Sequence, residues 1–230
     1  MDNEMRPGGV EITKYAFDAC DLPRSAKILD IGCGYGDTAD YLKREFGFSV
    51  TGMDNSADAI SRAKEKYPGT DFIEGDGQWL DFDSLSFDCL LMECVLSLMS
   101  NPVEAIHEAY CALKKGGYLI VHDLYLPYPS KDDYEVLEQI KKAKSGHTPS
   151  SCSEEILSIC TVDGAIIMDT IFDTLNELEL EKVLFEDRKA DLDSYVASMV
   201  FNGDDTKCYS EPRQGKSKMS YFLLIARKAE

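Results

Sequence analysis

The sequence lacks the long apolar run and the paired cysteines that mark two common classes of protein. No apolar stretch approaches the roughly 18 residues of a membrane-spanning helix. No CxxC pair occurs, so a closed structural zinc site is not expected, and no other metal site is indicated. The first residues, MDNEMRPGG, lack the basic-then-apolar order of a secretory signal. These absences predict a cytoplasmic protein with no membrane partner.

Basic residues are scarce in this chain. Lys and Arg total 24 against 42 Asp and Glu, so the formal net charge is −18 over 230 residues. Nucleic-acid affinity comes mostly from cations that displace counterions from phosphates, and so acidic a surface repels them. We therefore expect a small-molecule substrate and no nucleic-acid partner. The composition predicts no oligomeric state.

Disulfides are not expected either, although the chain has 8 cysteines. A disulfide framework is typical of small secreted domains, whereas this chain is long enough to bury a sizeable core. Most of the thiols should be reduced and buried, because free cysteine behaves as a small apolar side chain.

The first half of the chain alternates short apolar runs with longer amphipathic segments. Strands that alternate with helices predict an α/β fold with a parallel sheet and right-handed crossovers. The expected strands are Lys27–Ile31, Ser49–Met53, Asp71–Glu74, Phe87–Met92 and Gly117–Asp123, and the expected helices are Thr38–Glu45, Ala57–Lys66 and Pro102–Leu113.

This alternation stops after Asp123. We expect one domain over residues 1–230, with an insertion at about 125–180 that covers the substrate, because the stretch is too long for a simple crossover. Further expected features are helices near Tyr134–Ala143, Glu154–Ile159, Asp169–Leu178 and Asp191–Phe201, a capping box at Ser151–Glu154, strands at Lys182–Glu186 and Tyr221–Arg227, and a mobile loop at Gly203–Lys218.

The strongest motif is Ile28-Leu29-Asp30-Ile31-Gly32-Cys33-Gly34-Tyr35-Gly36, an apolar strand that runs into a glycine-rich turn before a helix. Glycines permit positive φ and allow a ligand to approach the backbone closely. A dinucleotide fingerprint needs a further glycine at position 37, where this chain has Asp37. A carboxylate at that helix start disfavours a pyrophosphate, whereas a sulfonium cation suits it.

Acidic and amide side chains follow the next strands. Asp54, with Asn55 beside it, ends the second strand, where an acid accepts hydrogen bonds from ribose hydroxyls. Asp76-Gly77-Gln78 follows the third strand, where a carboxylate can accept from an adenine amino group. Glu93 and Cys94 end the fourth strand, at the expected position of the reacting methyl group.

Together these motifs resemble the class I S-adenosylmethionine-dependent methyltransferases over about residues 25–125, as does LeuLysLysGlyGlyTyrLeuIleVal at 113–121. The resemblance implies S-adenosylmethionine as cofactor and a Rossmann-like seven-stranded sheet, mostly parallel with an antiparallel last strand, and helices on both faces. The cofactor-binding residues that it implies are Asp30, Gly32, Cys33, Gly34, Gly36, Thr38, Asp54, Asn55, Asp76, Gly77, Gln78 and Glu93.

A closer local resemblance concerns the methyl acceptor. Glu93-Cys94-Val95-Leu96-Ser97-Leu98 and Cys160-Thr161-Val162-Asp163-Gly164-Ala165 are similar to segments of the arsenite methyltransferases. This implies that Cys94 and Cys160 are catalytic and hold a trivalent metalloid, since soft atoms prefer thiolates. The chain departs from that family at Thr38, where the family has a further cysteine.

Other interpretations stay open at this point. An oxygen acceptor would need a base, for which His122, Asp123 and Glu93 are candidates, although His122 is more typical of a structural histidine. A noncatalytic adenosylmethionine-binding sensor and a nicotinamide-dependent oxidoreductase are the alternative functions. At the start, we expect a helix from Val10 after a disordered terminus, with Arg6 folded over the cofactor as the alternative.

Overall fold

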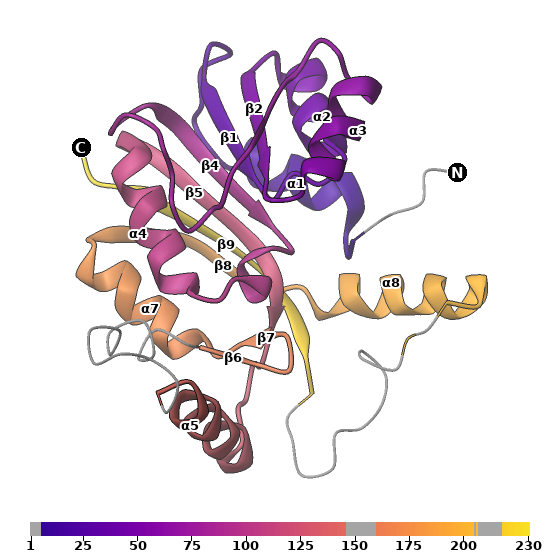
Figure 1. The fold of residues 1–230 in the computed structure, drawn as a ribbon, viewed down its shortest axis with the longest axis vertical. Helices are drawn as coiled ribbons and strands as arrows, with labels where there is room; N and C mark the ends of the chain where they lie inside the picture. Colours follow the sequence, from indigo (N-terminus) through magenta and orange to yellow (C-terminus); the bar gives the residue numbers. More distant parts are fainter. Residues whose placement is uncertain (1–5, 146–159, 205, 207–217) are drawn as a thin grey trace.

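The computed structural model describes residues 6–145, 160–204, 206 and 218–230, and its strands form one sheet (Figure 1). Seven of them lie in the order β3-β2-β1-β4-β5-β9-β8. Their bounds are β1 Lys27–Ile31, β2 Ser49–Asp54, β3 Asp71–Glu74, β4 Phe87–Glu93, β5 Leu113–Tyr125, β8 Leu180–Asp187 and β9 Ser220–Lys228. The expected strands are all present.

Strand direction follows the expectation. Strands β1 to β5 pair in parallel, and β9 runs antiparallel to both of its neighbours, β5 and β8. The sheet has two more strands than expected, because β6 (Thr161–Val162) and β7 (Ala165–Ile166) form a short hairpin that joins the end of β5 at Tyr125.

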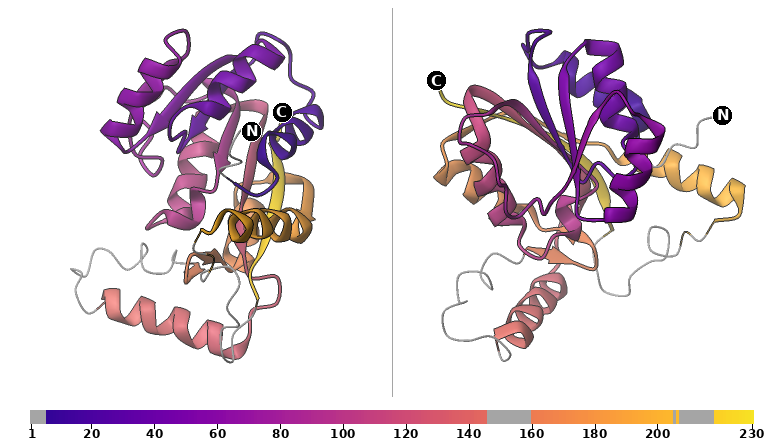
Figure 2. Two further views of the ribbon diagram at one scale, coloured as in Figure 1. Left: turned by 90° about the vertical axis from the view of Figure 1, so that its right-hand side faces the viewer. Right: turned by 45° about the horizontal axis from the view of Figure 1, so that its top comes forward.

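Helices cover both faces of the sheet (Figures 1 and 2). One face packs against α1 (Gly9–Asp18), α2 (Asp37–Phe46), α3 (Ala57–Lys66) and the start of α8 (Lys189–Asn202). The other packs against α4 (Pro102–Ala112) and α7 (Met168–Glu177). No helix in the described part of the chain is long and apolar enough to cross a bilayer.

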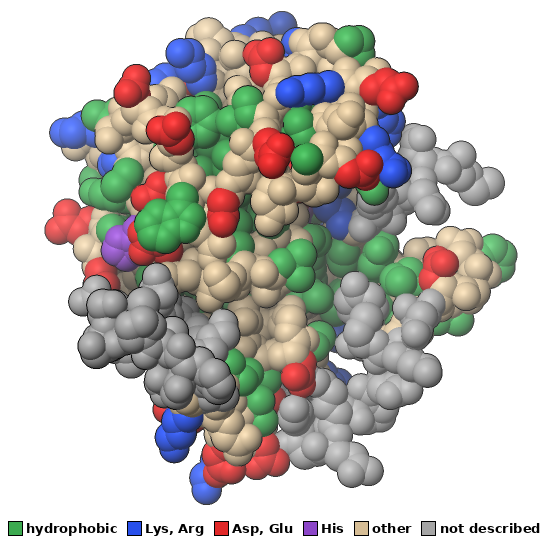
Figure 3. Space-filling view, viewed as in Figure 1, with side chains coloured by type: hydrophobic (Ala, Val, Ile, Leu, Met, Phe, Trp, Pro, Cys, Tyr) green, Lys and Arg blue, Asp and Glu red, His purple; other side chains and the backbone are tan. Residues whose placement is uncertain are grey.

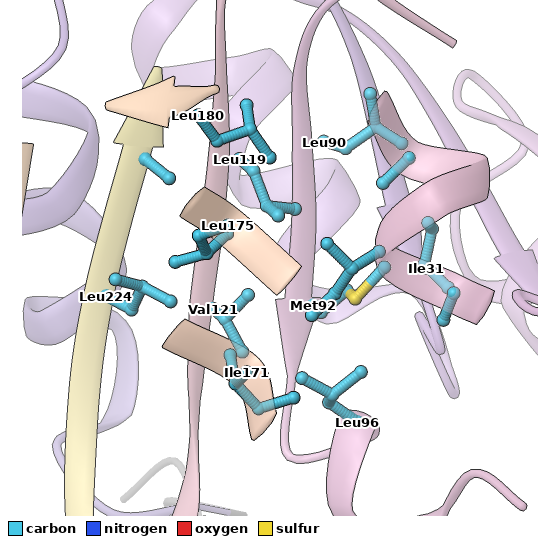
Figure 4. Packing of buried hydrophobic residues seen from close by; sticks show 14 of the residues in the cluster. Ile31, Leu90, Met92, Leu96, Leu119, Val121, Ile171, Leu175, Leu180 and Leu224 are labelled. Carbon is cyan, nitrogen blue, oxygen red and sulfur yellow. The ribbon is translucent and has the colours of Figure 1, made fainter. Parts of the chain in front are cut away.

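Alternating strand residues divide the core between the two faces. Met92 and Val121 belong to the cluster under α4 and α7, together with Ile171 and Leu175 of α7 (Figure 4). The neighbouring Leu91 and Ile120 belong to the cluster on the opposite face. This is the period of two expected of strands buried on both faces.

The region after β5 divides into two parts. Helix α7 is a regular crossover helix packed on the sheet. Helix α5 (Lys131–Ser145) and the hairpin lie together at one end of the sheet (Figure 1). The helix expected at Glu154–Ile159 and the capping box at Ser151–Glu154 lie outside the described residues, as does most of the loop at Gly203–Lys218.

Helix α8 projects from the body of the molecule. Only Leu192 is buried among its residues, and Val200 and Phe201 near its far end are exposed. The helix lies at the right of Figure 3. Its near end packs against β9. The helix thereby places Tyr195 beside the carboxyl ends of the parallel strands.

Candidate active site

The glycine turn is held by the neighbouring strand. The backbone N–H groups of Gly32 and Cys33 both donate to the carbonyl oxygen of Met53, at 2.7 and 3.0 Å. Gly34 donates its N–H to Asp54 Oδ2 at 2.9 Å. Gly32 has φ +75°, and a Cβ there would lie 2.4 Å from Val95 Cγ2. Only glycine fits this position, which fixes the turn where β1 ends.

A cleft of about 470 Å³ opens beside this turn, at the carboxyl ends of the parallel strands. It brings together seven of the residues singled out in the sequence: Gly32, Asp54, Asn55, Asp76, Gly77, Gln78 and Cys94. Asp76 accepts from the backbone N–H of Gln78 at 2.9 Å, and the Gln78 side-chain oxygen accepts from Asn101 N–H at 2.7 Å. The cleft wall is therefore ordered by its own hydrogen bonds.

The other expected cofactor residues do not line this cleft. Cys33, Gly34 and Gly36 form the turn, and a Cβ at Gly36 would meet the Phe72 ring at 2.4 Å, so this glycine permits close packing. Asp30, Thr38 and Glu93 lie in a buried polar group behind the cleft.

Glu93 is the centre of that buried group. Its carboxylate accepts hydrogen bonds from the hydroxyls of Thr13 and Thr38 at 2.6 and 2.7 Å. It also lies 3.0 Å from the Arg6 guanidinium and 2.7 Å from His122 Nε2. Burial opposes the ionisation of Glu93, but the interactions with Arg6 and His122 outweigh the effect of burial. They hold the pKa of Glu93 well below its usual range. Glu93 is therefore a carboxylate.

Asp30 has the opposite environment. Burial and the neighbouring charge of Glu93 raise the pKa of Asp30 well above its usual range, and Arg6 offsets only part of this rise. Its Oδ2 atom is buried and has no hydrogen-bond partner in the structure. Buried oxygens without a partner are uncommon in native proteins and indicate a missing donor.

A second cavity, of about 290 Å³, adjoins the first. It is lined by Arg6, Pro7, Cys94, Ser97, Leu98, Asp123, Leu124, Asp163, Gly164, Tyr195, Met219 and Tyr221. Cys94 and Leu98 line both cavities, so the end of β4 separates them. Asp123 is fixed in this wall, because it accepts from the N–H and hydroxyl of Ser97 at 2.8 and 2.7 Å.

The two cysteines singled out in the sequence lie in different environments. Cys94 is half-buried at the wall between the cavities and has a positive φ of 53°, an uncommon conformation for a residue other than glycine. Cys160 is fully buried in the core cluster under α7 and lines neither cavity. Among the described residues, no cluster of three His, Cys, Asp or Glu side chains is arranged to hold a metal ion.

Two features of the site were missed or misjudged from the sequence. Arg6 was expected to be disordered; instead it is half-buried and paired with Glu93. It lines the second cavity and not the cleft, so the alternative in which it folds over the cofactor stays a prediction. The hairpin at Asp163–Gly164 was missed. Both turn residues have positive φ, and Asp-Gly between apolar pairs is a recognisable hairpin signal.

The charge of Asp37, which in the sequence argues against a bound pyrophosphate, matters less in the structure. Asp37 is ion-paired with Lys66 at 2.7 Å and accepts from the Tyr67 hydroxyl at 2.8 Å, so its charge is partly compensated. The acidic character of the site comes instead from Asp54 and Asp76, which line the cleft.

Comparison with known proteins identifies relatives of this chain. The family described as methyltransferase domain matches residues 29–121. The phosphoethanolamine N-methyltransferase of Plasmodium falciparum is 25% identical over 230 residues, which cover 96% of this chain and 86% of the relative. The ubiquinone/menaquinone biosynthesis C-methyltransferase of Campylobacter jejuni is 35% identical over 106 residues, or 44% of this chain and 45% of the relative.

A solved structure has the same fold. Phosphoethanolamine N-methyltransferase 2 of Haemonchus contortus, in complex with S-adenosyl-L-methionine, superposes with a TM-score of 0.71 at 15% identity, over 100% of this chain and 55% of that one. This chain spans about half the length of most of the curated relatives it matches, for example 51% of a demethylmenaquinone methyltransferase.

Proposed function

Since residues 29–121 match the family described as methyltransferase domain, we propose that the chain binds S-adenosylmethionine and transfers its methyl group to a small molecule held in the 290 Å³ cavity. The proposal rests on the wall that the cleft and the second cavity share. Cys94 and Leu98 line both the cofactor cleft and the second cavity, so a donor in one and an acceptor in the other would meet at the end of β4. Methyl transfer is a displacement that depends chiefly on such placement.

The cleft offers groups for each part of the cofactor. We assign Asp54 to the ribose hydroxyls and Asp76 to the adenine amino group, since both acids line the cleft. Asp30 receives the ammonium, because its buried Oδ2 has no donor of its own. The bound cofactor supplies an electrophilic methyl group on a sulfonium. The chain contributes backbone turns that accept the ligand closely and carboxylates that favour its two cations.

The acceptor is proposed to be a small polar molecule. The Plasmodium relative, which aligns over most of both chains, is named for phosphoethanolamine, whereas the Campylobacter relative is a C-methyltransferase. Phosphoethanolamine is therefore the first acceptor to assay. The cavity lining carries two acids, Asp123 and Asp163, beside one cation, Arg6, and this favours an amine end over an anionic end inside it.

A metalloid acceptor is the second candidate. It is favoured by the position of Cys94 between the two cavities. The partner that the arsenite methyltransferase resemblance implies, Cys160, is packed in the core instead. Arsenite titration of the parent, Cys94→Ser and Cys160→Ser tests this candidate. Equal affinity in all three proteins rejects it.

Isothermal calorimetry with S-adenosylmethionine and with NADH tests the main proposal, followed by transfer of labelled methyl to phosphoethanolamine. We expect S-adenosylmethionine to bind and NADH not to bind. Tight NADH binding without adenosylmethionine affinity would favour the oxidoreductase. Cofactor binding without transfer to any small acceptor would favour the noncatalytic sensor. The second cavity favours the methyltransferase instead, because it offers room for an acceptor.

A further inference from the structure

We propose that Cys94, Tyr221, His122 and Glu93 form a proton relay that removes a hydrogen from the acceptor's reacting atom, so that the acceptor class is one with an N–H, O–H or S–H at that atom. The inference rests on the proposed function and deepens it. It excludes acceptors that react through a bare lone pair, such as thioethers, because these release no proton on methylation.

The four side chains form a continuous hydrogen-bonded chain. Cys94 Sγ lies 3.1 Å from the Tyr221 hydroxyl, which lies 2.7 Å from His122 Nδ1. The opposite nitrogen, Nε2, lies 2.7 Å from Glu93 Oε1. They come from three adjacent strands, β4, β5 and β9.

Two members of this hydrogen-bonded chain meet the cavities. Cys94 is half-buried and lines both, and Tyr221 lines the second, whereas His122 is fully buried and lines neither. Burial raises the pKa of the Cys94 thiol to about 12, so Cys94 stays protonated. The same cause raises the pKa of Tyr221. Neither group is a base by itself, and the proton must move on to the imidazole.

The hydrogen on one nitrogen of His122 follows from its neighbour. Glu93 is a carboxylate and can only accept, so His122 Nε2 carries a hydrogen. The relay requires a neutral ring, in which Nδ1 has a lone pair that accepts from the Tyr221 hydroxyl, and Arg6 at 3.0 Å is then the cation paired with Glu93.

The transfer balances as follows. The acceptor X–H loses its proton to Cys94 Sγ while the thiol proton moves to Tyr221 Oη and the phenol proton moves to His122 Nδ1. The X atom forms a bond to the methyl carbon as the bond from that carbon to the sulfonium sulfur breaks. The products are X–CH₃, a neutral thioether and an imidazolium ion that Glu93 stabilises.

The tautomer of His122 can be measured without an acceptor. Imidazole ¹⁵N spectra at pH 7.5 are simple to assign, because the chain has only 3 histidines and His122→Gln identifies the signal. We expect a neutral ring with hydrogen on Nε2. A hydrogen on Nδ1, or an imidazolium, overturns the relay because Nδ1 then cannot take a proton.

Variants test the relay in the reaction with labelled S-adenosylmethionine and phosphoethanolamine. Tyr221→Phe and Cys94→Ala should lower kcat by about 10² to 10⁴-fold, the usual contribution of general acid–base catalysis. Cys94→Ser should keep kcat within about tenfold of the parent, since a hydroxyl also carries a proton. The cofactor Kd, measured by calorimetry, should stay unchanged in Tyr221→Phe, because Tyr221 does not line the cofactor cleft.

Tyr125→Phe is the matched control. It removes a buried phenol hydroxyl that donates to Asp187 and lines neither cavity, so its kcat should equal that of the parent. A parental kcat in Tyr221→Phe overturns the relay alone. Failure of the parent to bind S-adenosylmethionine overturns the proposed function, and the relay with it. If the parent binds the cofactor but does not methylate phosphoethanolamine, the ¹⁵N result decides.

Discussion

Replacing Glu93 by Gln should destabilise the protein strongly, although it changes no side-chain shape. Glu93 and Arg6 are 7% and 15% exposed, so the substitution leaves Arg6 buried without its counter-ion. Removing one partner of a buried ion pair costs about 3–5 kcal/mol. For a chain of this length, each kcal/mol lowers Tm by about 2–4 °C, so the expected fall is about 6–20 °C.

The assay is thermal and chemical denaturation of ligand-free protein at pH 7.5. The control is Glu65→Gln, an exposed position on α3, which should change the free energy of unfolding by no more than about 0.5 kcal/mol. The double variant Arg6→Met/Glu93→Gln removes both charges and should be more stable than Glu93→Gln alone. A Glu93→Gln variant as stable as its control would refute the reasoning.

The loss should also depend on pH in a definite direction. The folded-state pKa of Glu93 lies below that of an unfolded glutamate, about 4.3. Its contribution to stability is therefore complete above the unfolded pKa and is lost as pH falls through the folded pKa. The difference in unfolding free energy between the parent and Glu93→Gln should shrink on acidification below about pH 4. A difference that grows there would contradict this assignment.

Three further predictions concern the cofactor site. Asp30→Asn should raise the unfolding free energy of the ligand-free protein at pH 7.5, because burial raises the pKa of Asp30. The same variant should bind S-adenosylmethionine about 10- to 100-fold more weakly in calorimetry. Tighter binding would refute the assignment of Asp30 to the ammonium. Gly32→Ala should lower the free energy of unfolding by about 2–5 kcal/mol in urea denaturation, because the position combines a positive φ with the contact to Val95. Gly34 also has a positive φ but no atom within 4 Å of the added Cβ, so Gly34→Ala should lower it by only about 1–2 kcal/mol. Equal losses would show that the contact has no effect. Asp54→Asn should weaken S-adenosylmethionine binding and lower Tm slightly, since the amide oxygen can accept from only one of the Gly34 and Ser56 N–H groups. Unchanged affinity would remove Asp54 from the cofactor site.

The parallel half of the fold could be predicted because its signals are local. Each strand is a short apolar run, and each functional residue stands directly after one. The turn at Gly32 and the acids Asp54 and Asp76 therefore fall at one edge of the sheet by topology alone. The cleft confirms that these residues lie together.

The rest of the site depends on contacts between distant segments. Arg6 is ordered by Glu93, and nothing in the flanking sequence indicates that contact. Tyr221 was expected only as a strand residue. It reaches His122 because β9 inserts antiparallel beside β5, a register that the sequence does not display. Cys160 shows the opposite case: its flanking residues resemble a binding motif, and in the structure the cysteine lies in the core beside the hairpin.

The two cavities draw on different stretches of the chain. Every residue that lines the cofactor cleft falls between positions 31 and 100, inside the part that matches the methyltransferase domain. Most of the acceptor cavity wall comes from before residue 8 and after residue 122. A chimera joined near residue 122 should therefore change most of the lining of the second cavity and leave every residue that lines the cleft in place.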